Sequence, residues 1–208
     1  MIPGFRGAAF SAAPDGDVRG DRDARETFAA RVGIPIEWAT AVQVHGNTVL
    51  LAESGGLQGE GDALVTEAAG VAVAVFTADC VGMVIEADEA VAVVHAGWRG
   101  AAAGIVQATL HRMRDLGHEP VRAAIGPSIG PCCYEVGPEV AQLFPGHVST
   151  TTWGTVSVDV AGFVSDTMAG VEVHQIGHCT RCDDGYFSHR RDNTPKRQAA
   201  IGWMPSNR

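Results

Sequence analysis

The sequence predicts a single mixed α/β domain built in layers, and three observations support this prediction. The 208 residues are 46% hydrophobic and 19% charged, a balance that is typical of globular proteins. Short apolar runs of strand length outnumber the segments with helical periodicity. No internal repeat, low-complexity tract or long linker divides the chain. We therefore expect residues 1–208 to form one domain with some hairpins and some crossover connections.

The first 35 residues contain one predicted helix, over residues 21–32. Asp23 lies near its start, and Gly33 together with Pro35 provides a stop signal. The rest of this segment is rich in Gly, Asp and Arg, and we expect it to carry little chemistry. Beyond Trp38, short apolar runs predict strands over residues 41–44, 48–52, 63–66, 71–78, 81–85, 90–94, 121–125, 156–160, 171–176 and 199–203.

Two of these predicted strands are apolar at nearly every position. Residues 71–78 and 90–94 do not alternate between apolar and polar side chains, so we expect other layers to cover both of their faces. Two further segments have helical periodicity. They are residues 101–116, which end at Gly117, and residues 137–144, which end before Pro145.

The charge and the apolar content exclude two classes of partner. Fifteen basic residues against 24 acidic ones give a formal charge of −9, which repels the phosphate backbone of nucleic acids. The longest apolar run, 68–78, is shorter than the ~20 residues that span a bilayer, and the N-terminus shows no secretion signal.

The cysteine content indicates the compartment. Five cysteines are an odd number for a disulfide framework and suit a reducing compartment. We expect a cytoplasmic protein with a small-molecule substrate.

Three residues that can bind metal share one sequence context. His45, Cys80 and His95 each stand at the carboxyl end of a predicted buried strand, where rigid elements pass into loops. A catalytic zinc ion takes three protein ligands of these types and keeps one open position. Convergence of the three strand ends would form such a site, whereas two hydrogen-bonded histidines and a core cysteine are the alternative interpretation.

Two segments are typical of anion binding. In His95-Ala96-Gly97-Trp98-Arg99-Gly100 the glycines permit close approach of a ligand, and Arg99 offers a guanidinium beside the positive end of a predicted helix. The segment Ser188-His189-Arg190-Arg191-Asp192 gathers basic side chains in a chain where they are scarce, with Lys196 and Arg197 close behind. The alternative for both segments is a solvated turn.

Four cysteines lie outside the predicted triad. Cys179 and Cys182 have the spacing of a zinc-binding pair, with His178 beside them, but a structural zinc ion normally needs a second pair. The other pair consists of the adjacent Cys132 and Cys133, whose adjacency makes joint tetrahedral ligation awkward. We therefore do not expect a structural metal ion here. The turn-rich segment 126–134 is expected to form a turn or the rim of a pocket.

Six short blocks occur in order between Gln43 and Gln198. They are Gln43-Val44-His45-Gly46, Asp62-Ala63-Leu64-Val65-Thr66, Thr77-Ala78-Asp79-Cys80, His95-Ala96-Gly97-Trp98-Arg99-Gly100, Ile125-Gly126-Pro127-Ser128-Ile129 with Cys133-Tyr134-Glu135-Val136, and Phe187-Ser188-His189-Arg190-Arg191-Asp192. In combination these blocks resemble the YfiH family, whose members are also called laccase-domain or polyphenol oxidase proteins and zinc-dependent purine nucleoside phosphorylases.

The resemblance implies a layered α/β/β/α sandwich with two central mixed sheets and one zinc ion held by His45, Cys80 and His95. It also implies phosphorolysis of adenosine, inosine, guanosine and methylthioadenosine, with deamination of adenosine as a side activity. Zinc can activate water for attack on C6 of adenine, and a basic pocket can hold phosphate for attack at C1′ of the ribose. Copper is expected only as an adventitious occupant of the zinc site.

The remaining site residues follow from the same blocks. We expect Asp79, Cys80 and His95 to be catalytic, with Asp79 beside Cys80 carrying a proton or orienting a ligand. Substrate or phosphate binding is assigned to Gln43, Arg99, His189, Arg190 and Arg191.

This sequence departs from the family pattern at three places. Residues 1–37 are divergent, Val81 stands where a proline is usual, and the ending common to relatives is altered before Gln198. The predicted triad is intact, so these departures concern the choice of substrate.

Three other functions fit part of this pattern. A copper oxidase of phenols would need about ten histidines, many in His-x-His pairs, but this chain has eight and no such pair. A cysteine hydrolase or deamidase would use Cys80 as nucleophile and His95 as base. A metal-binding protein without catalytic activity would keep the metal ion and turn over no nucleoside. Sensitivity to chelators distinguishes the zinc enzyme from the cysteine enzyme.

Overall fold

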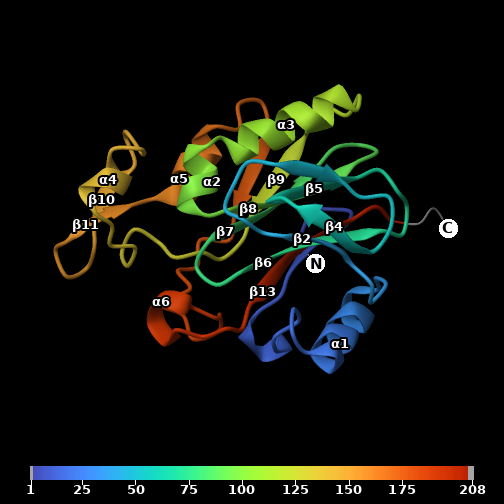
Figure 1. Cartoon of the computed structure of the whole chain (residues 1–208), viewed down its shortest axis with the longest axis horizontal. Helices are drawn as coiled ribbons and strands as arrows, with labels where there is room; N and C mark the ends of the chain where they lie inside the picture. The colour runs from blue at the N-terminus through green and yellow to red at the C-terminus, as the bar shows by residue number, and fades with distance from the viewer. Residues whose placement is uncertain (1, 206–208) are drawn as a thin grey trace.

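A computed structural model describes residues 2–205 and contains two β-sheets packed face to face with helices on both outer sides (Figure 1). Helix α1 (Arg22–Val32) covers one outer face, and α3 (Ile105–Asp115) lies on the opposite side of the molecule. This arrangement confirms the predicted α/β/β/α sandwich with mixed sheets.

Within the described residues one sheet has five strands and the other has six. The first has the order β1 (Ala8–Phe10), β13 (Gln198–Trp203), β6 (Ala72–Thr77), β2 (Ala39–Val42), β4 (Gly56–Glu60). The second has the order β12 (Glu172–Gln175), β9 (Arg122–Ile125), β7 (Val81–Glu86), β8 (Val91–Ala96), β5 (Ala63–Thr66), β3 (Val49–Leu51). Both sheets mix parallel and antiparallel neighbours, as β2 with β6 and β6 with β13 illustrate.

The remaining elements flank these sheets. A separate antiparallel hairpin consists of β10 (Val148–Thr150) and β11 (Val156–Val158). The other helices are η1 (Ala13–Asp15), α2 (Trp98–Ala102), α4 (Pro138–Ala141), α5 (Val160–Asp166) and α6 (His189–Asp192). Within residues 2–205, no helix has both the length and the apolar character needed to cross a membrane.

The two strands that are apolar at nearly every position, β6 and β8, are covered by other layers on both faces. In β6, Val73 and Val75 pack between the two sheets, whereas Ala74 and Phe76 face α1. Strand β8 likewise contributes its side chains alternately to the core between the sheets and to the core beneath the helices. This double coverage confirms the prediction for both runs and explains why neither run alternates with polar residues.

Most predicted elements are present, with corrected bounds. The predicted helix over 21–32 is confirmed as α1, whose N-cap Asp21 accepts hydrogen bonds from two backbone amides. The prediction of one helix over 101–116 was wrong, because Gly104 adopts a left-handed conformation, with φ 81°, and divides α2 from α3. The helix predicted over 137–144 is limited to α4. Sequence reasoning missed β1, η1, β4, β10, α5 and α6, all of which are short or polar.

Candidate metal centre and substrate cavity

The structure brings His45, Cys80 and His95 together at one point. One ligand atom from each residue lies within 4.8 Å of the other two. His45 follows β2 of the five-stranded sheet, and Cys80 lies in the three-residue connection from β6 to β7, which belong to different sheets. His95 lies inside β8 rather than after it, because that strand continues to Ala96. The proposed triad therefore draws its side chains from both sheets.

Asp62 holds two of these residues in place. Its buried carboxylate accepts a hydrogen bond from Nδ1 of His95 at 2.7 Å, which leaves Nε2 free for a ligand. The same carboxylate accepts hydrogen bonds from the backbone amides of Val44, His45 and Gly46 at 3.2, 3.0 and 2.7 Å. These amides fix the loop around His45, whose φ of 60° is unusual for a residue other than glycine. Asp62 thus connects the imidazoles from two separate elements.

The electrostatics of the triad favour a thiolate at Cys80. Burial raises the pKa of this thiol, but hydrogen bonds with His45 and His95 outweigh burial and lower the pKa to about 6. Burial lowers the pKa of His95, but hydrogen bonds to Asp62 and Cys80 raise it to about 9. Thiolate is the form of cysteine that both coordinates metal and acts as a nucleophile.

The donor set and its surroundings fit a zinc ion. Two imidazoles and one thiolate are the ligand types that zinc takes in catalytic sites, where a fourth position remains open. Cys80 is only half-buried and His45 is exposed, so the triad is reached from solvent. A cavity of about 650 Å³ opens directly onto all three residues. Such access is a property that a catalytic metal centre requires and that structural histidines with a core cysteine do not need.

Asp79 is held by two segments from the far end of the sequence. Its Oδ1 accepts a hydrogen bond from the hydroxyl of Thr180, and its Oδ2 accepts one from the backbone amide of Arg190, both at 2.7 Å. Its carbonyl oxygen accepts a hydrogen bond from the amide of Ile129 at 2.8 Å. The φ of Asp79 is 96°, a strained value that these contacts maintain. Both carboxylate oxygens are therefore occupied in orienting the turn that carries Cys80.

Two of the residues assigned to substrate line the cavity. Gln43 pairs its side-chain amide with the backbone of Phe76, donating to the carbonyl oxygen and accepting from the amide, both at 2.8 Å. His189 reaches the cavity from the start of α6. Arg197, which the sequence placed in the basic segment typical of anion binding, also lines the cavity. Arg19 and Arg25, which sequence reasoning did not select, complete a basic wall with it.

The other three predicted anion-binding residues contact protein groups outside the lining of this cavity. Arg191 donates hydrogen bonds to the carbonyl oxygens of Thr180 and Tyr186 at 2.8 and 2.9 Å. Arg190 donates to the carbonyl oxygen of Glu135 at 3.1 Å. The guanidinium of Arg99 lies 4.3 Å from the ring centroid of Trp98.

The missed residues left different traces in the sequence. Asp62 stands directly before a strand that is largely apolar. A carboxylate at such a position is expected to be buried, and a buried charge needs hydrogen-bond partners. Arg19 and Arg25 lie in the N-terminal segment in which we expected little chemistry, and both line the cavity. No local motif marks them, since their position depends on how α1 packs on the five-stranded sheet.

Gly97 provides a sensitive test of this geometry. A Cβ atom at this position would lie 2.8 Å from Cδ2 of His45 and 3.2 Å from Sγ of Cys80. The backbone of Gly97, with φ −66°, accepts alanine without strain, so only the steric contact matters. We expect Gly97→Ala to displace the His45 ring and to weaken zinc binding ~10-fold or more, the scale of disturbed ligand orientation. Competition with a zinc indicator dye measures this affinity. Unchanged affinity in the variant would contradict the proposed ligand set.

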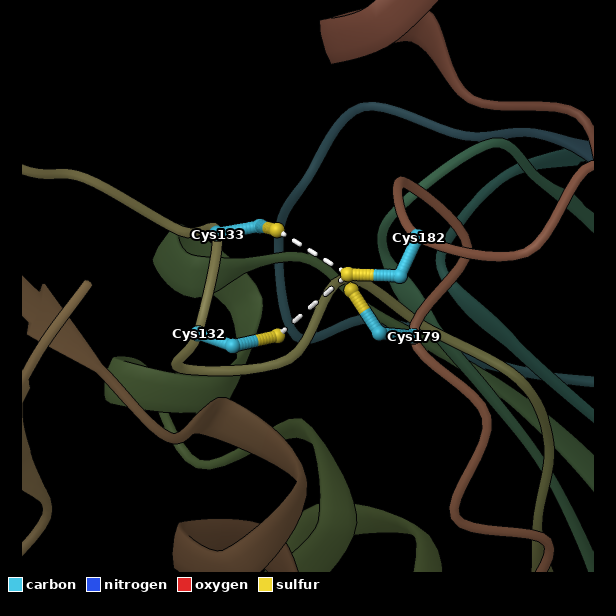
Figure 2. Close-up of side chains that lie close together, drawn as sticks. All are labelled: Cys132, Cys133, Cys179 and Cys182. Carbon is cyan, nitrogen blue, oxygen red and sulfur yellow. Dashed lines mark hydrogen bonds between the residues drawn. The ribbon is translucent and has the colours of Figure 1, made fainter. Parts of the chain in front are cut away.

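The two cysteine pairs also meet in the structure (Figure 2). One sulfur atom from each of Cys132, Cys133, Cys179 and Cys182 lies within 4.8 Å of the other three. The adjacency of Cys132 and Cys133, which led us to expect no structural metal ion here, does not keep the pairs apart, because the turn at 130–134 directs both sulfurs toward Cys182.

Comparison with known proteins agrees with this architecture. The family model described as multi-copper polyphenol oxidoreductase laccase matches residues 15–205. A Streptomyces griseus protein named purine nucleoside phosphorylase ORF3 is 38% identical, over 96% of this chain and 92% of its own length. The Corynebacterium glutamicum protein named purine nucleoside phosphorylase Cgl2154/cg2365 is 36% identical, over 78% of this chain and 72% of its own length.

A solved structure has the same overall fold. The crystal structure of YlmD from Geobacillus stearothermophilus superposes with a TM-score of 0.82 at 27% identity, covering 98% of this chain and 94% of the other. The family match spans nearly the whole sandwich and both sheets that supply the triad. The chain therefore belongs to the multi-copper polyphenol oxidoreductase laccase family, the laccase-domain or YfiH family that its sequence blocks resemble.

Proposed function

We propose that this chain is a purine nucleoside phosphorylase that holds a zinc ion with His45, Cys80 and His95. The observation that carries the proposal is the single cavity of about 650 Å³ that joins this triad to the basic wall of Arg19, Arg25 and Arg197. Such a cavity accommodates a nucleoside together with an anion. The names of the similar Streptomyces and Corynebacterium proteins support the same activity.

The basic wall is suited to inorganic phosphate. Arginine stays protonated at physiological pH and binds phosphate oxygens with paired N–H groups. Burial lowers the pKa of Arg25 and of Arg197, which shows that both guanidiniums are partly desolvated. A partly desolvated cation attracts an anion more strongly than a fully hydrated one does. In a chain with a formal charge of −9, this concentration of positive charge is a local exception.

In the proposed reaction an oxygen of phosphate attacks C1′ of the ribose. The bond from C1′ to the purine nitrogen breaks, its electron pair leaves with the base, and the base takes up a proton. Arg19, Arg25 and Arg197 hold the attacking phosphate, and His189 at the start of α6 hydrogen-bonds the nucleoside. Gln43 is fixed by its pairing with Phe76 and presents a shaped wall to the substrate. When bound, zinc supplies a Lewis acid that stabilises negative charge developing on the substrate.

Asp79 acts in this proposal as a positioning residue. Its two carboxylate oxygens hold Thr180 and Arg190, so it maintains the turn that presents Cys80. Arg191 supports the same loop through its hydrogen bonds to backbone carbonyl oxygens. Arg190 and Arg191 would then affect the site by holding these segments in place rather than by contacting the anion.

Adenosine deamination is the proposed side activity of the same cavity. In that reaction water adds to C6 of adenine and ammonia leaves, so no phosphate is consumed. Both reactions would use the zinc ion held by the triad, which in deamination activates the attacking water.

The ligand types and the free cysteines bear on the metal and on the compartment. Copper would bind the same three ligands adventitiously, since imidazole and thiolate also suit copper. The five free cysteines of the structure fit a reducing compartment, and we propose the cytoplasm.

A product assay with purified protein tests the proposal. Adenosine and inosine are incubated separately, with and without phosphate, and the bases and nucleosides are separated by chromatography. Release of hypoxanthine from inosine only when phosphate is present supports phosphorolysis. Formation of inosine from adenosine without phosphate supports the side activity. Absence of every product from protein that carries its full zinc content would contradict the enzyme and favour a metal-binding protein without catalytic activity.

The two sets of arginines can be separated by mutation. We expect Arg197→Gln to raise the KM for phosphate roughly 10-fold or more, because a lost hydrogen bond to a charged group costs about 1.5–3 kcal/mol. The matched change Arg191→Gln is expected to lower thermal stability while leaving the KM for phosphate nearly unchanged, because its guanidinium binds backbone carbonyl oxygens and, unlike that of Arg197, lies outside the lining of the cavity. Initial rates over a range of phosphate concentrations decide between them. A higher KM for phosphate in Arg191→Gln and an unchanged KM in Arg197→Gln would instead show that Arg191 binds the anion.

A further inference from the structure

The four cysteines outside the triad form a compact cluster at the meeting of two loops. Residues 126–136 supply Cys132 and Cys133, and residues 177–188 supply Cys179 and Cys182. The sulfur of Cys182 lies 3.8 Å from that of Cys132 and 3.3 Å from that of Cys133. Figure 2 shows the four side chains pointing toward a common centre from the two loops.

These separations match a tetrahedral metal site better than a disulfide. Zn–S bonds of about 2.3 Å place the four sulfurs of a tetrahedral site about 3.8 Å apart. All four sulfurs lie within 4.8 Å of one another, and all are free rather than bonded in pairs. A disulfide would need two sulfurs at about 2.05 Å and would leave the other two without a role.

The backbone on both sides is shaped to present the sulfurs. The amides of Cys182 and Asp183 donate hydrogen bonds to the carbonyl oxygen of Cys179 at 3.1 and 3.0 Å, so this segment turns tightly and both sulfurs emerge on one side. On the other loop, the amides of Cys133 and Tyr134 donate to the carbonyl oxygen of Gly130 at 2.9 and 3.0 Å. Adjacent cysteines can therefore both contribute, because they lie on a tight turn rather than on an extended strand.

Neighbouring groups are suited to an anionic cluster. The amide of Gly130 donates a hydrogen bond to Sγ of Cys179 at 3.2 Å, and the guanidinium of Arg181 donates one to Sγ of Cys133 at 3.5 Å. Donors of this kind stabilise thiolates that bind a metal ion. A cavity of about 240 Å³ bordered by Cys132 and Cys179 provides a route for an ion to enter.

We infer that Cys132, Cys133, Cys179 and Cys182 bind a second, structural zinc ion. Four thiolates around one ion are typical of closed structural zinc sites, which need no position for a substrate. The thiols release their protons to solvent on binding, and the resulting charge is offset in part by Arg181. This inference does not depend on the proposed phosphorolysis, since it concerns different side chains.

The cluster joins the two loops that hold Asp79. Thr180, between Cys179 and Cys182, donates its hydroxyl to one carboxylate oxygen of Asp79, and Ile129 donates its amide to the carbonyl oxygen of Asp79. The backbones of the two loops pair at the bridge between Ser128 and Cys179, where the amides of Ser128 and Thr180 donate hydrogen bonds to the carbonyl oxygens of His178 and Ser128. A metal ion bound by cysteines from both loops would stabilise their arrangement more than these few hydrogen bonds do. The second ion thus holds in position the two loops that contact Asp79, the residue next to Cys80.

Metal analysis of the full chain tests this inference. Protein purified in reducing buffer with added zinc is freed of excess metal and its zinc content per chain is measured. We expect two ions in the wild type, one in the Cys179→Ser/Cys182→Ser double variant, and one in Cys80→Ala. The two variants serve as controls for each other, because each removes a different set of ligands. Equal zinc content in the double variant and the wild type would overturn the inference.

A second measurement covers the case in which the double variant does not fold. Cobalt is exchanged into Cys80→Ala, which retains only the four clustered cysteines. We expect the intense thiolate-to-cobalt charge-transfer absorption of a tetrahedral sulfur site, and its absence would overturn the inference. Mass spectrometry that finds Cys133 and Cys182 joined by a disulfide in zinc-supplemented, reduced protein would also overturn it. In the folded double variant we expect faster hydrogen exchange in residues 126–136 and 177–188 than in the sheets.

Discussion

Replacing Cys80 with alanine is expected to remove the zinc ion of the triad and to slow phosphorolysis at least ~100-fold. Loss of a hydrogen-bonding partner of a ligand already costs ~10–100-fold in metal affinity or activity, and loss of a ligand costs more. Cys80 is the only thiol among the three side chains, and it lies between two imidazoles that favour its thiolate form. Zinc content and the rate of phosphate-dependent base release are measured on the same preparation.

A second variant separates a metal ligand from a nucleophile. Aspartate is also a zinc ligand but has no thiol, so Cys80→Asp is expected to keep part of the zinc and part of the activity. Chelation of the wild type should abolish activity, and added zinc should restore it. Activity that survives complete chelation but not alkylation of Cys80 would instead support a cysteine hydrolase.

The second large effect is expected from Asp62→Asn. This change keeps the size of the side chain but replaces an anion that accepts three amide hydrogen bonds and one from His95. The new NH₂ group would face N–H donors in a buried site, so we expect zinc affinity to fall ~10–100-fold. Competition with a zinc indicator dye measures the affinity, and thermal unfolding without metal measures the stability.

Glu86 offers a matched control for this prediction. It is also a buried carboxylate, and its Oε1 accepts hydrogen bonds from the backbone amides of Arg6 and Gly7 at 2.8 and 3.0 Å. We expect Glu86→Gln to destabilise the fold by about 1–3 kcal/mol without a change in zinc affinity. A similar loss of zinc affinity in both variants would show that Asp62 acts through general stability alone.

Local patterns in the sequence were sufficient to predict the layers. Runs such as 71–78 are apolar on both faces, and that property follows directly from coverage by two neighbouring layers. Strand-end positions predicted that His45, Cys80 and His95 would meet, and the three side chains do meet, although β2 before His45 is only partly buried and His95 lies inside β8. The break at Gly104 was not predictable from periodicity, since glycine is tolerated within helices.

Contacts between distant segments explain what sequence reasoning missed. Arg19 and Arg25 reach the cavity only because α1 packs on the five-stranded sheet, and nothing in their neighbourhood along the chain indicates this. The two cysteine pairs are separated by more than forty residues and meet only through a pairing of irregular loops. Adjacency along the chain was a poor guide there, because the turn at 130–134 decides the direction of each sulfur.

The triad spans the boundary between the two sheets, and this position has a consequence for how the protein changes over evolutionary time. His45 belongs to one layer, His95 to the other, and Cys80 to the connection between them. Gly202 leaves so little space between the layers that an added methyl group would lie 2.7 Å from Val91. A larger side chain anywhere in this interior would push the layers apart and, with them, the two imidazoles. We therefore expect the reaction to constrain substitutions in the interior between the sheets, far from any substrate.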